Sequence, residues 1–346
     1  MSIILIMSAL EQNERQILLK HLHDVVVEKH PDTGTDYYKG KFETKKGLVN
    51  IILAKTDQTN VNAGIETERA IAHFSPNYIF FSGVAGALKD AKIGDIVIAQ
   101  DVYGYERGKA TTENENGVVK SVYKVRPRFG ITSYALEKSA TNFAFTDQWK
   151  MEAGLLYDHK FKNAIKVYTG TIAAGEKVDA DEKSELHILL QHYCSHALAI
   201  EMEGLGFLEA CRAYPQIQTL LLRGISDELS NKEDADMSGS QEYASNNVAS
   251  FLFSFINDQI TPLISPISVH ENLVNILCKL YPEGIKDKRI WTRAGGDLSR
   301  IQLNSPGQTQ WIDAVELIEN GGTIITIESL IALVKIDFPN SKFYTD

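Results

Sequence analysis

The chain has 346 residues, of which 44% are hydrophobic and 23% charged, as in ordinary globular proteins with a substantial core. A net charge of −10, from 35 Lys and Arg against 45 Asp and Glu, argues against a surface that coats a nucleic acid polymer. The three cysteines, Cys194, Cys211 and Cys278, lack metal-ligand and disulfide spacing, so we expect a cytoplasmic protein without a metal site.

Apolar runs alternate with amphipathic stretches through the first 260 residues. The opening run, Ile3–Met7, is too short for a signal peptide, and no segment reaches the roughly 18–20 apolar residues of a membrane span. Further strands are predicted at Leu48–Ala54, Tyr78–Ser82, Asp95–Val102, Lys166–Ile172, Ala197–Glu201 and Thr219–Gly224, with helices at Ala63–His73, Tyr134–Thr141 and Gly204–Ala213. This alternation predicts an α/β fold with a parallel or mixed sheet between helices.

The composition changes after residue 260. Residues 261–268 contain two prolines and two serines, and we interpret them as a linker. Helical spacing returns at His270–Leu280, Trp311–Ile318 and Ser329–Ile336. We therefore predict a domain over residues 1–260 and a small, mostly α-helical domain over residues 269–346.

Carboxylates follow two of the predicted strands. Glu201 and Glu203 lie in the segment Ala199–Gly204, and Asp227 ends the segment Leu220–Asp227. Strands of an α/β sheet open their ligand crevice at their carboxyl ends, so we expect these acids at a binding site. Two carboxyl groups with different surroundings can act as hydrogen-bond acceptor and as proton donor, which suits cleavage of a ribosyl–base bond.

Five ordered segments resemble the nucleoside phosphorylase and methylthioadenosine nucleosidase superfamily over residues 1 to about 260. They are Ser8–Glu11, Ser82–Leu88 followed by Ile93–Val97, Gly170–Glu176, the Glu-Met-Glu segment at 201–203, and Arg223–Asp227. The resemblance implies a phosphorylase/hydrolase-like three-layer fold around a mixed sheet. It also implies an N-glycosidase that acts on a purine nucleoside or nucleotide and needs no cofactor.

The resemblance assigns roles to single residues. Asp227 matches the residue that protonates the purine N7, although a helix N-cap is the alternative interpretation. Glu203 matches the acceptor of the ribose hydroxyls, while Glu201 and Arg223 are expected to serve structure. The remaining matches are Met202 against the ribose, Ser226 and Val178 beside the base, and Gly83, Val84, Ala85 and Gly86 at the pocket floor. Because Val178 replaces an aromatic residue, base stacking is expected from Tyr103 or Tyr105.

The pattern departs from the phosphorylases where phosphate would bind. Their phosphate-binding arginine has no counterpart at the end of Ile79–Ser82, and Arg15 is expected to face solvent. Phosphate without cationic partners binds poorly in a partly buried site, so the sequence favours water as the nucleophile. The water-orienting Glu of the family falls on Asn13 in the most direct register. Glu11 and Glu14 are the candidates after a small shift, with Glu11 slightly preferred.

Four cationic residues lie close together in the sequence of an otherwise acidic chain. Arg107, Lys109, Arg126 and Arg128 are candidates for binding the phosphates of a nucleotide such as ATP or AMP, which would arrive with Mg²⁺. The alternative interpretation is solvated loop charges.

The tail resembles the small helical effector-associated domains of bacterial defence proteins. The resemblance rests on Leu280–Pro282, Arg293–Gly296, Gln310–Ile312 and Phe338–Asn340, and implies recruitment by a protein partner. A stabilising extension is the alternative. Relatives of the fold often complete their sites across subunits, so a homo-oligomer is expected.

Three rival functions stay open at this point. One is a catalytically degenerate nucleotide-binding sensor, favoured by Asn13, Val84 and Val178. The others are a phosphate-dependent purine nucleoside phosphorylase and a methylthioadenosine salvage enzyme, the latter disfavoured by the tail and the cationic segments.

Overall fold

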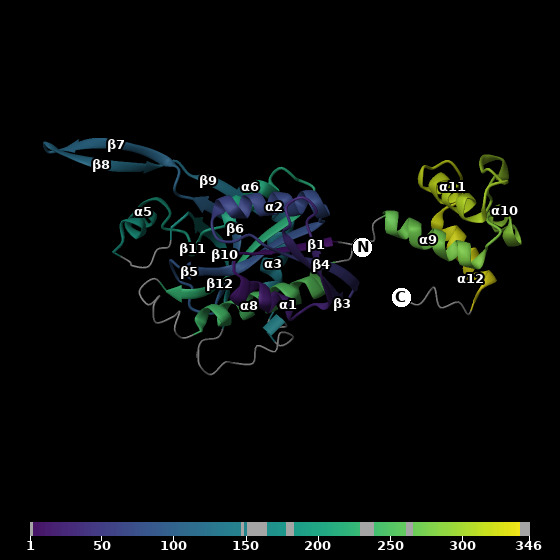
Figure 1. Ribbon diagram of the computed structural model, residues 1–346, viewed down its shortest axis with the longest axis horizontal. Helices are drawn as coiled ribbons and strands as arrows, with labels where there is room; N and C mark the ends of the chain where they lie inside the picture. Colours follow the sequence, from purple (N-terminus) through teal and green to yellow (C-terminus); the bar gives the residue numbers. More distant parts are fainter. Residues whose placement is uncertain are drawn as a thin grey trace. The chain divides into compact units, whose positions relative to one another are not determined.

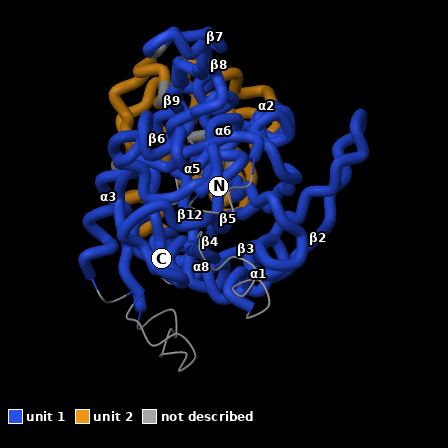
Figure 2. Tube along the Cα trace, turned by 90° about the vertical axis from the view of Figure 1, so that its left-hand side faces the viewer, with its two compact units in different colours: residues 1–262 blue, residues 263–346 orange. Residues whose placement is uncertain are grey.

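The computed structural model describes residues 3–146, 149–150, 165–177, 183–228, 239–260 and 266–339. The chain divides into two compact units, Met1–Pro262 and Leu263–Asp346, which are coloured separately in Figure 2. In the part of the chain that is described, no helix is long and apolar enough to cross a membrane.

A ten-stranded mixed sheet forms the centre of the first unit (Figure 1). Its order is β11-β10-β6-β12-β5-β1-β4-β3-β2, with β9 beside β6. Because β11 pairs with β5 as well as with β10, the strands β5, β12, β6, β10 and β11 close into a ring. The strands are β1 (Ile3–Ser8), β2 (His23–Lys29), β3 (Asp36–Thr44), β4 (Gly47–Lys55), β5 (Tyr78–Ala87), β6 (Ile96–Gly104), β9 (Arg128–Ile131), β10 (Val167–Ala174), β11 (Ala199–Glu201) and β12 (Gln218–Glu228).

Helices cover both faces of this sheet (Figure 1). On one face, α2 (Asn60–Phe74) and α6 (Gly204–Cys211) bury Ala70 and Phe207 in one hydrophobic cluster. On the other, α1 (Gln16–Leu19), α3 (Tyr134–Ala144) and α8 (Ser240–Gln259) contribute to a second cluster. Central strands that are buried on both faces read as continuous apolar runs, which is why β1, β5 and β12 were recognisable in the sequence. The predicted α/β class with a mixed sheet is confirmed.

A β-ribbon lies between Arg107 and Arg126, two of the cations proposed to bind phosphate, for which solvated loop charges were the alternative interpretation. Strands β7 (Gly108–Glu115) and β8 (Val118–Val125) pair with each other, and with no other strand of the described residues, and they project from the first unit (Figure 1). Most described side chains of β8 are exposed, so the ribbon lacks the apolar alternation that marks a half-buried strand. The mostly exposed edge strand β2 escaped prediction for the same reason.

The second unit is helical and has its own core. Its helices are α9 (Pro266–Leu280), α10 (Ile290–Arg293), α11 (Gly307–Glu319) and α12 (Ile327–Asp337), with short 3-10 turns at Asp287–Arg289 and Leu298–Arg300. Trp291 and Trp311 are fully buried in it. The indole of Trp311 donates to the carbonyl of Tyr281 at 3.1 Å, and the Tyr281 hydroxyl donates to Asp337 at 2.7 Å. Helices were expected in this region, and helices are present.

Candidate active site

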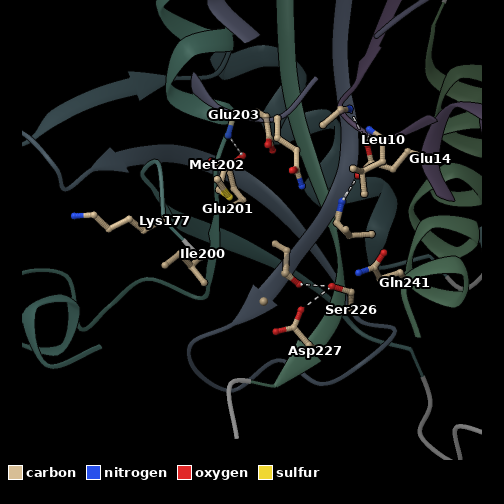
Figure 3. Close-up of a pocket in the computed structure, with 15 residues that line it drawn as sticks. Leu10, Glu14, Lys177, Ile200, Glu201, Met202, Glu203, Ser226, Asp227 and Gln241 are labelled. Atoms are coloured by element: carbon tan, nitrogen blue, oxygen red, sulfur yellow. Dashed lines mark hydrogen bonds between the residues drawn. The ribbon is translucent and has the colours of Figure 1, made fainter. Parts of the chain in front are cut away.

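A pocket lies where β5, β11 and β12 meet the loop that follows β1 (Figure 3). Its volume is about 660 Å³ when the open space at its mouth is included. The lining residues are Ala9, Leu10, Glu14, Gln58, Val84, Ala85, Gly86, Lys177, Ile200, Glu201, Met202, Glu203, Ser226, Asp227 and Gln241. The fold thus brings together most of the site residues that the sequence suggested.

Asp227 reaches the pocket through an irregularity in β12. The parallel register of β12 on β5 pairs Ile225 with Ala85 and then Asp227 with Gly86, so Ser226 is an extra residue. Such a bulge redirects side chains, and both Ser226 and Asp227 line the pocket. Ser226 Oγ donates to Asp227 Oδ2 at 2.9 Å (Figure 3). The other oxygen, Oδ1, is buried and has no partner among the described residues, which leaves it for a ligand.

Glu201 and Arg223 form a buried ion pair beside the ribose-binding candidate Glu203. Arg223 Nη2 lies 2.5 Å from Glu201 Oε2 and 3.4 Å from Glu203 Oε2. Glu201 also accepts the N–H groups of Glu203 and Gly204, which fixes the turn into α6. These contacts agree with the structural roles expected for Glu201 and Arg223.

Glu14 lies opposite this pair in the first loop. Residues Glu11–Arg15 form a π-helical turn in which the Arg15 N–H donates to the Leu10 carbonyl, five residues back. The wider turn carries Glu14 into the pocket. Its Oε2 accepts the N–H groups of Ala9 and Leu10 at 2.7 and 2.9 Å, and its Oε1 accepts that of Val84 at 3.0 Å. Burial raises the pKa of Glu14, and Arg223 and these amides partly offset the rise.

The placement of Glu14 corrects the preference for Glu11. Glu11 forms an ion pair with Arg15, its side chain is 38% exposed, and it does not line the pocket. Arg15 is itself buried, with its guanidinium 4.5 Å from the Tyr38 ring centre, so the expectation that it faces solvent is wrong. Asn13 bonds Gln241 at 2.9 Å instead. Matching the sequence to the family pattern without gaps cannot reveal a π turn. That match therefore put Asn13 at the position of the water-orienting Glu.

The four candidate phosphate-binding cations are not gathered at the pocket. Arg107 and Arg126 flank the β-ribbon, where the Arg126 N–H donates to the Arg107 carbonyl at 2.7 Å. Lys109 lies on β7, and Arg128 pairs with Glu209 on α6 at 2.7 Å. None of these four side chains lines the cavity. Among the described lining residues, Lys177 alone carries a positive charge.

The expected base-stacking residues are also absent from the described lining. Tyr103 and Tyr105 are 5% and 1% exposed and pack in a separate cluster with Ala173 and Cys194. Val178 lies outside the described residues. Gly83 lies under the pocket rather than at its surface, because a Cβ there would come within 2.5 Å of Arg223 Nη1 and 2.8 Å of Glu14 Oε1.

The turn before α2 adds residues that sequence reasoning missed. The N–H of Thr59 donates to Glu203 Oε1 at 3.3 Å, and Gln58 lines the pocket. Thr59 has φ 91° and Asp57 φ 57°, conformations that are costly for residues with a Cβ. No sequence signal marks a non-glycine turn of this kind. The described residues include no group of three or more His, Cys, Asp or Glu side chains that could hold a metal ion.

The first unit is therefore a mixed α/β domain with a carboxylate-rich pocket at its strand ends. The chain belongs to the Phosphorylase superfamily, whose family model matches residues 3–257.

The chain is similar to several nucleosidases among the curated relatives and the solved structures. It is 26% identical over 255 residues, 73% of this chain and 97% of the relative, to the aminodeoxyfutalosine nucleosidase of Helicobacter pylori strain J99. It is 25% identical to the 5'-methylthioadenosine/S-adenosylhomocysteine nucleosidase of Buchnera aphidicola, over 69% of this chain and 92% of the relative. The fold resembles that of the corresponding Neisseria meningitidis enzyme with a TM-score of 0.56 at 20% identity, covering 74% of this chain and 99% of that one.

Proposed function

We propose that the first unit hydrolyses the N-glycosidic bond of a purine nucleoside. The observation that carries this proposal is the convergence of Asp227, Glu203 and Glu14 on one pocket at the strand ends. The superfamily assignment and the nucleosidase relatives support it.

We propose Asp227 as the general acid. When the C1′–N9 bond breaks, its electron pair moves onto the base, and a proton delivered to N7 neutralises the charge that develops there. Asp227 Oδ1 is the buried oxygen without a described partner, while Oδ2 is held by Ser226. We assign the donated proton to Oδ1. A Cβ added at Gly86 would lie 3.0 Å from Oδ1, so a larger residue at this position would crowd that oxygen.

We propose that Glu203 and Met202, which line the pocket, hold the ribose. As the base departs, positive charge builds on the sugar, and a fixed carboxylate nearby lowers the energy of that state. Glu203 is 6% exposed, and its Oε1 accepts the N–H of Thr59 at 3.3 Å.

Glu14 is our candidate for activating the nucleophile. In the balanced reaction a water molecule adds to C1′, its proton passes to Glu14, and the base leaves protonated at N7. The described lining supplies one lysine and four carboxylates, surroundings that disfavour a phosphate nucleophile. We therefore propose hydrolysis rather than phosphorolysis.

Base release tests this function directly. The full chain is incubated with adenosine, 5′-methylthioadenosine, AMP and Mg²⁺-ATP, with and without inorganic phosphate, and free adenine and free sugar are separated by chromatography. We expect adenine from a nucleoside at a rate that phosphate does not change. Strict dependence on phosphate would establish a phosphorylase. Binding without release over hours would establish the sensor, and a preference for AMP or ATP would establish a nucleotide substrate.

For the second unit we propose recruitment by a protein partner, as an effector of bacterial defence. Its independent core supports a module that functions as a unit, and the resemblance of its motifs to effector-associated domains supplies the role. Ile324 is 85% exposed there. We expect Ile324→Glu to abolish binding to a protein that carries a like domain while base release is unchanged. Light scattering of the full chain tests the expected homo-oligomer.

A further inference from the structure

Three carboxyl groups surround a single guanidinium at the ribose end of the pocket. Glu14, Glu201 and Glu203 are 4–6% exposed and Arg223 is fully buried. One cation cannot balance three anions in such dry surroundings, because each unpaired buried charge costs several kcal/mol. Burial therefore favours protonation of at least one of the three carboxyl groups. The hydrogen bonds that each group accepts indicate which one it is.

Glu201 and Glu14 are each well supplied with donors. Glu201 has the short ion pair with Arg223 and accepts the N–H groups of Glu203 at 3.0 Å and Gly204 at 2.7 Å. Glu14 accepts three backbone N–H groups, at 2.7, 2.9 and 3.0 Å. Several donors directed at a carboxylate favour its ionised form, and in Glu14 they oppose the rise in pKa that burial causes.

Glu203 is the least supported of the three. Its contacts are the Thr59 N–H at 3.3 Å and Arg223 Nη2 at 3.4 Å, both at the long limit for hydrogen bonds. The charged groups that face it are Glu201 from β11, Arg223 from β12 and Glu14 from the π turn. Burial and the charges of Glu201 and Glu14 raise the pKa of Glu203 to about 8, although Arg223 acts in the opposite direction.

We propose that Glu201, by occupying Arg223, keeps Glu203 protonated in the free enzyme, and that a bound ribose expels this proton. The second half rests on the proposed function. On binding, the O–H bond of Glu203 breaks and the proton leaves to solvent. The two oxygens then accept hydrogen bonds from two ribose hydroxyls, and these replace the donors that the free site lacks. Glu201 is thus a positioning residue that sets the charge of the ribose site without touching the sugar.

The first half is tested without any ligand. The full chain is labelled with ¹³C at the glutamate side-chain carboxyls and titrated by NMR. We expect one carboxyl with a midpoint near pH 8, absent from Glu203→Gln and shifted to lower pH in Glu201→Gln, where Arg223 is released to pair with Glu203. Glu209→Gln is the matched control. Glu209 lies on α6 and pairs with Arg128 away from the pocket, so its substitution should leave that midpoint unchanged.

Two results of this titration would overturn the proposal. One is the absence of any carboxyl that titrates above about pH 6, well beyond the ordinary glutamate range. The other is loss of the high-pH resonance in Glu14→Gln rather than in Glu203→Gln, which would place the proton on Glu14.

The second half is tested by calorimetry. Asp227→Asn holds adenosine intact, and its binding heat is measured at pH 7 in buffers of different ionisation enthalpy. We expect release approaching one proton per site, none when Glu203→Gln is added, and a reduced amount when Glu201→Gln is added. A binding heat independent of the buffer contradicts proton release. If the wild type releases no base from any substrate while the midpoint near pH 8 persists, the proposed function fails and the protonation of Glu203 stands.

Discussion

The pocket and the β7–β8 ribbon both contain many charged residues, but most of these residues are buried in the pocket and exposed on the ribbon. In the pocket, the side chains of Arg223 and Glu201 are each 1% exposed. On the ribbon, Lys124 and Glu113 pair at 2.6 Å with side chains 53% and 52% exposed. An exposed pair contributes about 0–1 kcal/mol and is screened by salt, whereas a buried charge without its partner is strongly unfavourable. A cluster of charges in a sequence therefore indicates a site only where the strands converge and exclude water.

The most direct test of this contrast is a substitution of Asp227, the residue that we propose protonates the purine base. We expect Asp227→Asn to lower kcat/KM for base release by about 10²–10⁴-fold, the usual contribution of a general acid. The amide keeps the shape of the carboxyl group but cannot deliver the proton. Thermal unfolding serves as the control for folding. Activity at the wild-type level would remove Asp227 from the mechanism.

Two matched substitutions, at Glu14 and at Glu11, test which glutamate activates the water nucleophile. Glu14→Gln should lower kcat by about 10²-fold, because the amide cannot take a proton from water. Glu11→Gln changes an acid three residues away that is paired with Arg15 outside the pocket, and should alter kcat by less than about threefold. The opposite ranking would restore Glu11 as the water-activating residue.

The buried carboxyls also make stability depend on pH. The folded-state pKa of Glu203, about 8, lies above that of an unfolded glutamate, so the unfolded chain loses its proton first as pH rises. Its contribution to stability is complete below about pH 4 and is lost as pH rises through 8, by at most about 1.4 kcal/mol per pH unit. Glu14 acts in the same direction. Urea unfolding between pH 5 and 8 should show a flatter dependence in Glu203→Gln. Identical slopes for variant and wild type would argue that Glu203 is ionised when folded.

The comparison also explains what the sequence could predict. Strands β1, β5 and β12 are buried on both faces, so their apolar runs were visible in the sequence, as were the acids at the ends of β11 and β12. The exposed strands of the ribbon carry no such pattern, and their cations could not be distinguished from a phosphate site. The positions of Glu14 and Thr59 depend on backbone conformation, a π turn and a positive φ, which residue types alone do not encode.

The smallest expected effect concerns the ribbon itself. Arg107→Gln, Lys109→Gln and Arg126→Gln together should change kcat/KM for a nucleoside by less than about twofold, because these side chains lie outside the pocket and act through solvent. Arg128 is left intact because its bond to Glu209 ties β9 to α6. The same triple variant assayed on AMP and ATP decides whether the ribbon has a separate role. A tenfold or greater loss of kcat/KM on AMP and ATP alone would mean that their phosphates contact the cations at the start of the ribbon. The ribbon would then belong to the substrate site, and its charges could no longer be contrasted with those of the pocket as merely solvated.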